Sequence, residues 1–367
     1  MSAPQKTLAE ARVEIDALDA QLQQLIAQRA RVAEQVREIK AASGATGDHY
    51  RPAREAEVLR RAMARNRQID SPLPDEVMAR LMREIMSACL ALESPLAVAY
   101  LGPEGTYTQA AVYKHFGHQV AARAMTAIDE IFRDVESGAA AYGVVPIENS
   151  TEGVISSTLD LLAGTPLSIC GEVWLPVHHQ FLSAHERIED VKVIYSHPQS
   201  LAQCRRWLDS RLPGVPREPV SSNGAAAKRV AETKEGAAIA SAAAGELYGL
   251  RVLASNVEDD PNNTTRFLIL GRHTPEATGS DRTSLVCSAP SGGEAGALFR
   301  LLEPIANAGI NLSKIESRPS RRGLWDYNFF LDLEGHRDDV AVADALNVVR
   351  SRAAFFRILG SYPRAVV

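Results

Sequence analysis

A short polar segment near the middle of the chain contains the first residues that could do chemistry. Glu148, Asn149 and Ser150 directly follow the apolar run 144–147, which is typical of a buried strand. In an open α/β sheet, ligands bind where strands end and helices begin. The three side chains are therefore candidates for binding a small polar ligand. The alternative is a local turn in which Asn149 and Ser150 satisfy backbone groups.

Polar side chains also border two other predicted strands. One strand ends at Ser196, and Gln203 lies in the helix-like segment that follows it. Thr265 and Arg266 stand at the start of the last strand in this part of the chain. Because the ends of such strands gather around the cleft between α/β lobes, we expect these side chains to face one ligand.

A glycine-containing turn joins the strand at 96–101 to a helix that Thr106 can cap. The free N–H groups at the start of a helix bind anions, so this turn is a candidate anion cradle. It is not a nucleotide-binding P-loop, because no Gly-Lys-Ser/Thr sequence follows.

The histidines in this region have structural interpretations. His197 precedes a proline and is interpreted as a turn residue. His178 and His179 are interpreted as strand and surface residues, since no carboxylate or cysteine at metal-binding spacing accompanies them.

The first ninety-five residues have the pattern of helices. Apolar residues recur at alternating steps of three and four, which predicts a heptad seam on a helix over 8–42. Such a helix would be roughly 50 Å long at 1.5 Å per residue, so we expect a second chain to cover it. The seam consists of Ile15, Leu18, Leu22, Leu25, Val32, Val36 and Ile39.

One residue departs from this seam. Arg29 occupies an apolar position, and Lys40 lies three turns further along nearly the same face. Two cations separated by small apolar residues could bind a dianion inside a helical bundle. The alternative is that Arg29 extends its charge to solvent or sets the oligomeric state.

Composition excludes several classes of protein. The 367 residues are 46% hydrophobic and 23% charged, and the formal net charge is −5, which does not favour nucleic-acid binding. No apolar run reaches the ~20 residues of a membrane helix, and no signal peptide is evident, so we expect a soluble cytoplasmic protein. Scattered cysteines predict neither disulfides nor a metal site: Cys89, Cys170, Cys204 and Cys287.

The patterns divide the chain into three domains. Residues 1–95 are predicted to be all-α, and residues 96–275 alternate between strands and helices, which predicts an α/β domain with two lobes. A polar linker precedes residues 282–362, whose pattern predicts a βαββαβ domain.

The N-terminal cations resemble those of the all-helical chorismate mutase family, in which three helices interlock with a second chain. Arg12, Arg29, Lys40 and the Arg54-Glu55 pair carry the resemblance. It implies that Arg12 reaches into the partner's site and that Arg29 and Arg54 hold carboxylates. Lys40 would bond the ether oxygen and Glu55 the ring hydroxyl. The reaction, chorismate to prephenate, needs no cofactor or metal.

The end of the third predicted helix adds one residue to this resemblance. Glu93 matches a position at which many members of the family have glutamine. A glutamate there can donate to the ether oxygen only when it is protonated.

The α/β domain resembles prephenate dehydratase, whose two lobes are like those of a periplasmic binding protein. Four ordered motifs carry the likeness, around Thr106, Asn149, Ser196 and Thr265. The resemblance implies catalytic roles for Asn149, Gln203 and Thr265, with Thr265 donating to the hydroxyl that leaves. It also implies substrate contacts by Thr106, Ser150 and Arg266, with Arg266 or the N–H groups of a helix cap neutralising the side-chain carboxylate of prephenate.

The C-terminal domain resembles an ACT domain, an amino-acid-sensing module. The resemblance implies phenylalanine binding between two chains by Gly296, Ala297 and Leu298 on a helix and by Asn311, Glu316, Ser317 and Arg318. Together the resemblances imply a homodimeric or larger bifunctional enzyme that makes phenylpyruvate and is inhibited by phenylalanine. The alternative is a non-catalytic ACT-domain sensor of small molecules.

Overall fold

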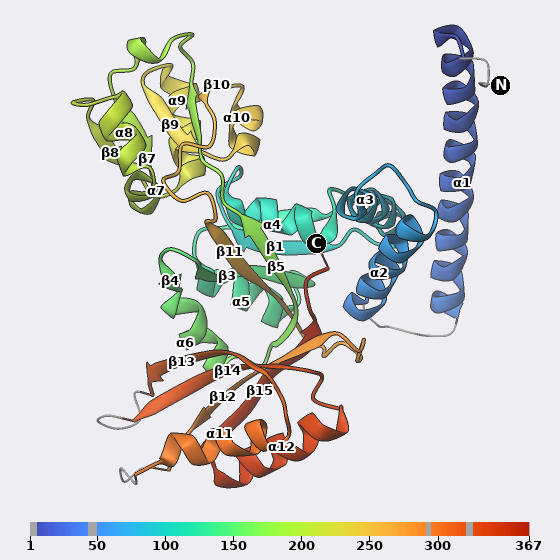
Figure 1. The fold of residues 1–367 in the computed structure, drawn as a ribbon, viewed down its shortest axis with the longest axis vertical. Helices are drawn as coiled ribbons and strands as arrows, with labels where there is room; N and C mark the ends of the chain where they lie inside the picture. Colours follow the sequence, from blue (N-terminus) through green and yellow to red (C-terminus); the bar gives the residue numbers. More distant parts are fainter. Residues whose placement is uncertain (1–5, 43–49, 291–294, 321–325, 367) are drawn as a thin grey trace, which may run out of the picture.

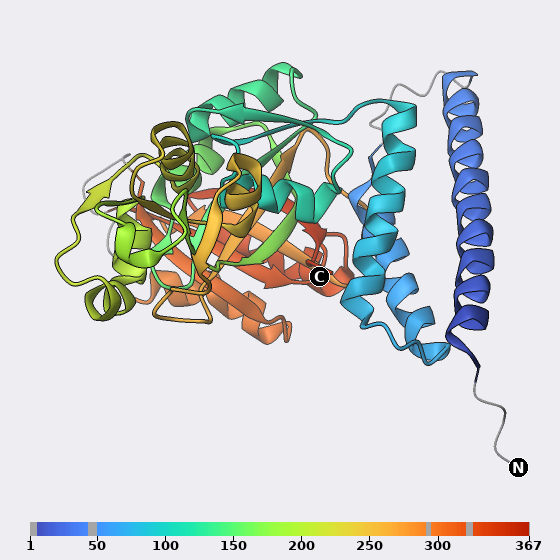
Figure 2. The same ribbon diagram turned by 90° about the horizontal axis from the view of Figure 1, so that it is seen from above.

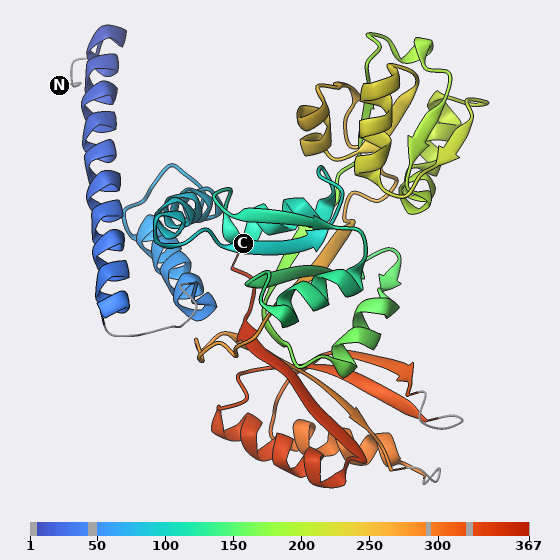
Figure 3. The same ribbon diagram turned by 180° about the vertical axis from the view of Figure 1, so that it is seen from behind.

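The computed structural model describes residues 6–42, 50–290, 295–320 and 326–366. They form a helical unit, a two-lobed α/β unit and a C-terminal α+β unit, which confirms the predicted fold classes (Figure 1). The first lobe of the α/β unit lies at the centre. The second lobe and the first helix lie on opposite sides of it (Figures 2 and 3).

The helical unit consists of α1 (Leu8–Ala42), α2 (Pro52–Gln68) and α3 (Asp75–Glu93). Proline in the first turn suits the start of α2, because its missing N–H would have had no partner there. Helices α2 and α3 pack on each other, and α1 packs on α3 on the outside of the molecule (Figures 1 and 2). The apolar seam of α1 is exposed, with Leu25 at 63% and Ile39 at 67%.

The first lobe is built on a sheet in the order β2-β1-β3-β11-β5, with β4 paired to β3. Its central strand β3 is buried from residue 142 to residue 147, as its apolar run predicts. The long strand β11 runs antiparallel to both neighbours. The strands are β1 (Ala97–Leu101), β2 (Ala121–Met125), β3 (Tyr142–Asn149), β4 (Gly153–Val154), β5 (Ser168–Pro176) and β11 (Thr264–Gly271), and the helices α4 (Tyr107–Phe116), α5 (Ile128–Ser137) and α6 (Ser156–Gly164).

The second lobe has a sheet in the order β10-β6-β9-β7-β8. The chain enters this lobe between β5 and β6 and returns between β10 and β11, so two segments cross the junction between the lobes. Its strands are β6 (Gln180–Ser183), β7 (Ile194–Ser196), β8 (Arg217–Pro219), β9 (Ala237–Ala240) and β10 (Arg251–Ala254), and its α-helices are α7 (Pro198–Gln203), α8 (Arg205–Arg211), α9 (Asn223–Thr233) and α10 (Ala242–Tyr248).

The C-terminal unit has the predicted βαββαβ order and an antiparallel sheet, β13-β14-β12-β15. Helices α11 and α12 cover one face of this sheet, and the other face meets the first lobe (Figures 1 and 3). The elements are β12 (Asp281–Ser288), α11 (Ala297–Asn307), β13 (Leu312–Pro319), β14 (Tyr327–Glu334), α12 (Val340–Arg352) and β15 (Phe355–Pro363).

Hydrophobic cores continue across the boundaries between the units. Val286 and Leu359 of the C-terminal sheet share one core with Ile147 and Leu268 of the first lobe. Tyr50, just before α2, is buried in another core of the first lobe. The burial of these apolar side chains therefore holds the three units together in addition to stabilising each one.

A buried network of charged groups joins the C-terminal sheet to the first lobe. The guanidinium of Arg266 on β11 donates to Glu172 of β5 at 2.9 Å and to Asp332 of β14 at 2.5 Å. Its third nitrogen donates to Tyr362 of β15 at 3.0 Å. Arg282 of β12 donates to the same Glu172 carboxylate. The charges of the two arginines therefore balance those of the two carboxylates. Charged groups that are buried away from water need such partners.

Removing the arginine at the centre of this network should destabilise the protein strongly. Arg266→Met would leave Glu172 and Asp332 with fewer partners in a buried site, so we expect a loss of about 3–5 kcal/mol in the free energy of unfolding. Arg133→Met is the control, because the Arg133–Asp129 pair is exposed and should contribute less than about 1 kcal/mol. Urea unfolding of both variants measures the difference, and equal small losses would contradict the importance of the network.

Candidate active sites

A cleft of about 840 Å³ lies between the two lobes. Thr106 lines it from the start of α4, Asn149 from the end of β3, and Gln203 from the end of α7. Thr265, near the start of β11, completes the group. The structure therefore brings these four predicted site residues together from four separate segments of the chain.

The predicted pairing of Asn149 and Thr265 follows from strand register. The two residues are direct partners on β3 and β11. The Oδ1 atom of Asn149 accepts from the backbone N–H groups of Thr151 at 3.0 Å and Glu152 at 3.1 Å. Because those donors fix the orientation of the amide, its Nδ2 must donate, and it lies 2.8 Å from the Thr265 hydroxyl oxygen.

This fixed amide determines the orientation of its neighbours in turn. Asn149 Nδ2 also donates to Asn263 Oδ1 at 2.8 Å, so the Asn263 Nδ2 donates to Gln203 Oε1 at 3.0 Å. The same Gln203 oxygen lies 2.9 Å from His179 Nε2, which must therefore carry the proton. His179 Nδ1 can then only accept, and the hydroxyl of Tyr107 lies 2.8 Å from this nitrogen and 2.8 Å from the backbone oxygen of His178.

Two consequences follow for the chemistry of the cleft. Burial lowers the pKa of His179, so this ring is neutral at physiological pH and serves to hold Gln203. The Thr265 hydroxyl oxygen accepts from Asn149, and its proton has no acceptor among the described residues. The hydroxyl proton is therefore free to be donated to a ligand in the cleft.

The structure also shows which interpretations of the histidines hold. His178 is exposed and contacts Glu258, whereas His179 is 1% exposed and lines the cleft, so the surface interpretation is wrong for His179. The one feature of the sequence that could have indicated the burial of His179 is its position in the segment that crosses between the lobes. His197 caps α7 by accepting from the N–H of Gln199 at 3.4 Å, which confirms the turn interpretation.

Two predicted substrate contacts are not part of the cleft. Ser150 Oγ accepts from the backbone N–H of Thr264 at 3.0 Å, so it binds the neighbouring segment of β11 and neither the cleft nor its own turn. Arg266 points to the opposite face of β11 from Thr265, because successive side chains alternate along a strand, and it is buried in the network with the C-terminal sheet. The expectation that Arg266 neutralises a carboxylate of the substrate is corrected.

The second candidate site lies along the contact between α1 and α3. Lys40 Nζ lies 3.3 Å from Glu93 Oε2, and Arg29 donates to the backbone oxygen of Ile85 at 3.5 Å. Arg12 is exposed near the other end of α1, about 25 Å from Arg29 at 1.5 Å per residue. Arg12 therefore cannot reach the Arg29 site of its own chain.

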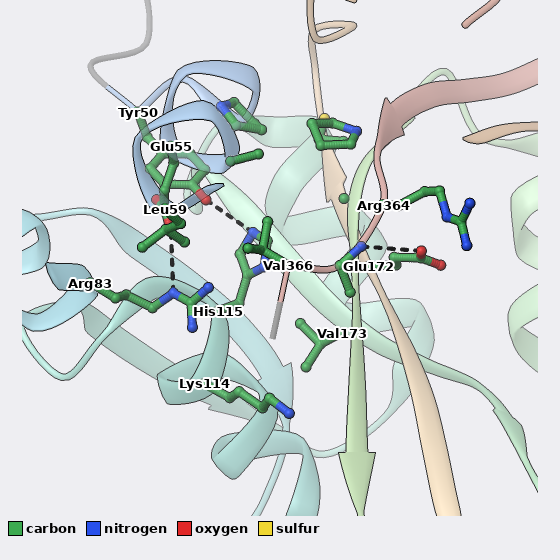
Figure 4. A pocket seen from close by; sticks show the side chains of 16 residues that line it. Tyr50, Glu55, Leu59, Arg83, Lys114, His115, Glu172, Val173, Arg364 and Val366 are labelled. Carbon is green, nitrogen blue, oxygen red and sulfur yellow. Dashed lines mark hydrogen bonds and ion pairs between the residues drawn. The ribbon is translucent and has the colours of Figure 1, made fainter. Parts of the chain in front are cut away.

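Glu55 occupies a different place from the one expected. Its carboxylate lies 3.4 Å from Arg83 of α3, in a cluster with Tyr50 that faces the first lobe (Figure 4). Burial raises the pKa of Glu55. Arg54 points outward and pairs with Glu57 at 2.6 Å. The structure does not bring Arg54 and Glu55 together with Lys40, and the assignment of Glu55 to a ring hydroxyl is corrected to an interface role.

The predicted phenylalanine residues lie at two places in the C-terminal unit. Gly296, in the left-handed region at φ 76°, precedes Ala297 and Leu298 in the first turn of α11. Glu316, Ser317 and Arg318 lie on β13. Asn311 precedes β13, about 20 Å from Ser317 at roughly 3.3 Å per residue. One chain therefore does not gather Asn311 and Ser317 around the same small ligand.

Comparisons with known proteins agree with this division. Residues 11–94 match the family model of chorismate mutase type II, residues 98–275 that of prephenate dehydratase, and residues 291–351 that of the ACT domain. The bifunctional chorismate mutase/prephenate dehydratase of Neisseria gonorrhoeae is 50% identical over 356 residues, covering 96% of each chain. That of Pseudomonas aeruginosa is 49% identical, with 100% of both chains covered.

A solved structure is similar over the two C-terminal units. The prephenate dehydratase of Arthrobacter aurescens, in complex with L-Phe, superposes with a TM-score of 0.69 and 37% identity. The match covers 74% of this chain and 90% of that one. No helix among the described residues is long and apolar enough to cross a membrane.

The cluster around Glu55 should make stability depend on pH. Burial, with Arg83 nearby, lowers the pKa of His115 to about 3 from its ordinary value near 6.5, and His115 Nε2 lies 3.0 Å from the Tyr50 hydroxyl. Below pH 6.5 the unfolded chain binds a proton there that the folded chain does not, so stability falls as the pH is lowered. We expect His115→Gln, which keeps a hydrogen-bonding group beside Tyr50, to flatten this dependence in melting curves between pH 7.5 and pH 4.5. Parallel curves for the two proteins would exclude His115 as the cause.

Proposed function

Because this chain belongs to the family of bifunctional chorismate mutase/prephenate dehydratases, we propose that it rearranges chorismate to prephenate and converts prephenate to phenylpyruvate. The dehydratase reaction occurs in the cleft between the lobes. The contact between Asn149 and Thr265 carries this assignment, since it leaves the Thr265 hydroxyl proton directed to a ligand. We also propose a cytoplasmic location, with which the absence of a disulfide among the four buried cysteines agrees.

The chemistry of prephenate suits a cleft whose hydrogen-bond donors are neutral. The ring carboxylate leaves as CO₂, its electron pair enters the ring, and the hydroxyl on the opposite ring carbon departs as the ring becomes aromatic. Thr265 donates a hydrogen bond to that hydroxyl and stabilises the negative charge that develops on it. Asn149 holds the Thr265 oxygen, and Gln203, fixed by His179 and Asn263, orients the substrate.

The mutase reaction uses the contact between α1 and α3. Chorismate rearranges within one molecule, so the site must hold a compact conformer and stabilise charge on the breaking ether bond. Lys40 donates to the ether oxygen, and Glu93, whose carboxyl lies 3.3 Å from Lys40 Nζ, donates to it when protonated. Arg29 binds a carboxylate as a bidentate donor.

We propose that two chains pair through α1. The exposed apolar seam of this helix supports the pairing, because at least two such chains are needed to remove it from water. Pairing also gives Arg12 a role, since it lies too far from Arg29 to complete a site in its own chain. Each mutase site would then consist of residues from both chains.

The third part of the proposal is feedback inhibition by phenylalanine at the C-terminal unit. The strand β13 carries Glu316, Ser317 and Arg318, and it also contacts the first lobe directly. Lys314 of β13 lies 2.6 Å from Glu148, the residue before Asn149. An effector that moves β13 therefore acts on the strand that holds the dehydratase site.

The two activities should be separable by single substitutions. Supplied with chorismate and no cofactor, the wild-type protein should produce phenylpyruvate. Thr265→Ala should accumulate prephenate, because it lacks the donor for the leaving hydroxyl, with a loss in the dehydratase rate of about 100-fold or more. Lys40→Ala should leave chorismate unconverted and still convert added prephenate.

Absorbance assays of chorismate and phenylpyruvate measure both steps. Near-normal phenylpyruvate formation by Thr265→Ala would remove Thr265 from the mechanism. Absence of both reactions in the wild-type protein would favour the non-catalytic sensor instead.

Regulation has its own test. Asn311→Ala should raise the phenylalanine concentration for half-inhibition about tenfold or more, because a hydrogen bond to a charged ligand contributes about 1.5–3 kcal/mol. The control is Asn347→Ala, because Asn347 is exposed on the outer helix α12. The ratio of inhibited to uninhibited dehydratase rates across a phenylalanine series measures the effect, and superimposable curves would place the effector elsewhere.

A further inference from the structure

The cleft between the lobes lacks the side chains that most often bind carboxylates. Prephenate carries two carboxylates, yet among the described residues that line the cleft there is no lysine or arginine. Arg266 lies on the other face of β11. Burial lowers the pKa values of His179 and His197, so these rings are neutral. The substrate must therefore be bound by neutral donors.

Helix N-termini are the strongest neutral source of positive potential in the cleft. Helix α4 begins at its lining residue Thr106, and α9 begins with Asn223, which also lines the cleft. The two ends meet closely, because a Cβ at Gly224 would lie 2.7 Å from the backbone oxygen of Glu104. The hydroxyls of Thr106 and Ser222 accept from the third N–H group of each helix. The first two N–H groups have no acceptor within the helix and can bind an anion.

Asn223 supplies a second, independent observation. It is only 9% exposed, and its Oδ1 lies 3.2 Å from the backbone N–H of His197 and 3.0 Å from Ser200 Oγ. A backbone N–H can only donate, so this contact fixes which end of the amide is oxygen. The Nδ2 group has no hydrogen-bond partner among the described residues. The structure thus contains an oriented donor, carried by a largely buried side chain, in the wall of the cleft.

We infer that Asn223 Nδ2, together with the first N–H groups of α9, binds the side-chain carboxylate of prephenate. This inference rests on the proposed function and names the group that binds one end of its substrate. The side chain and the ring hydroxyl are on opposite ring carbons, so the hydroxyl contacts Thr265 in the first lobe while the side chain extends toward α9 in the second. Asn223 is accordingly a substrate-binding residue that determines specificity for a 2-oxo acid side chain.

The chemistry explains why the ring carboxylate is not the group bound there. That carboxylate must lose its charge as it becomes CO₂, and a group that stabilised it in the bound substrate would oppose the reaction. The side-chain carboxylate keeps its charge throughout. Binding it stabilises substrate and transition state equally, which affects KM and leaves kcat nearly the same.

Asn223→Asp tests the assignment in the full-length protein. The aspartate keeps an oxygen for His197 and Ser200 but replaces the donor by a negative charge. We expect the KM for prephenate to rise about tenfold to 100-fold, with a much smaller change in kcat. Phenylpyruvate retains the side-chain carboxylate and lacks the ring carboxylate, so its inhibition constant as product should rise by the same factor.

Matched measurements separate the possible outcomes. Asn347→Asp, an identical change on the exposed face of α12, should alter neither constant, and mutase activity reports that each protein is folded. Unchanged KM, or a higher KM with unchanged inhibition by phenylpyruvate, would overturn the assignment. A wild-type protein that does not convert prephenate would overturn the proposed function instead. If Asn223→Asp does not fold, Asn223→Ser gives the same readouts, because it keeps an oxygen and lacks Nδ2.

Discussion

The alternation of side chains along β11 is the constraint on which the arrangement of this molecule depends. Thr265 and Arg266 are adjacent, so they must point to opposite faces of the sheet. One face carries the hydroxyl that serves the cleft, and the other carries the guanidinium that holds Glu172 and Asp332. In the proposed mechanism, catalysis and attachment of the C-terminal unit therefore use neighbouring residues of one strand. A shift of this strand changes both.

Backbone N–H groups set the directions of the side-chain hydrogen bonds in the cleft, beginning at Asn149. The N–H groups after Asn149 fix its amide, and every hydrogen bond as far as the His179 ring then has one possible direction. Such a chain costs little to reorganise during the reaction, because its dipoles are already oriented. A cleft lined by neutral donors also suits a step in which a carboxylate is discharged, since a cation beside it would stabilise the bound substrate.

Sequence patterns predicted the elements and the motifs but could not give the direction of each side chain. Asn149, Gln203 and Thr265 were predicted as cleft residues because they stand at strand and helix ends, where topology alone brings segments together. Arg266 and Ser150 are one residue away from cleft residues, and only the register of β3 with β11 shows that they face elsewhere. His179 belongs to a crossing segment whose burial depends on both lobes.

Contacts between domains are subject to the same limit, because local sequence patterns do not show how one domain meets another. The spacing in α1 predicted its length and its apolar seam, because both are properties of one helix. The position of Glu55 depends on how α2 meets the first lobe, where Arg83 and Tyr50 surround its carboxylate. Burying a Leu or Ile side chain contributes about 1.5–3 kcal/mol, so the seven exposed seam residues of α1 provide ample energy for pairing two chains. In the proposed pairing, the same contact would bring Arg12 to a site that its own chain cannot reach, so each mutase site would need residues from both chains.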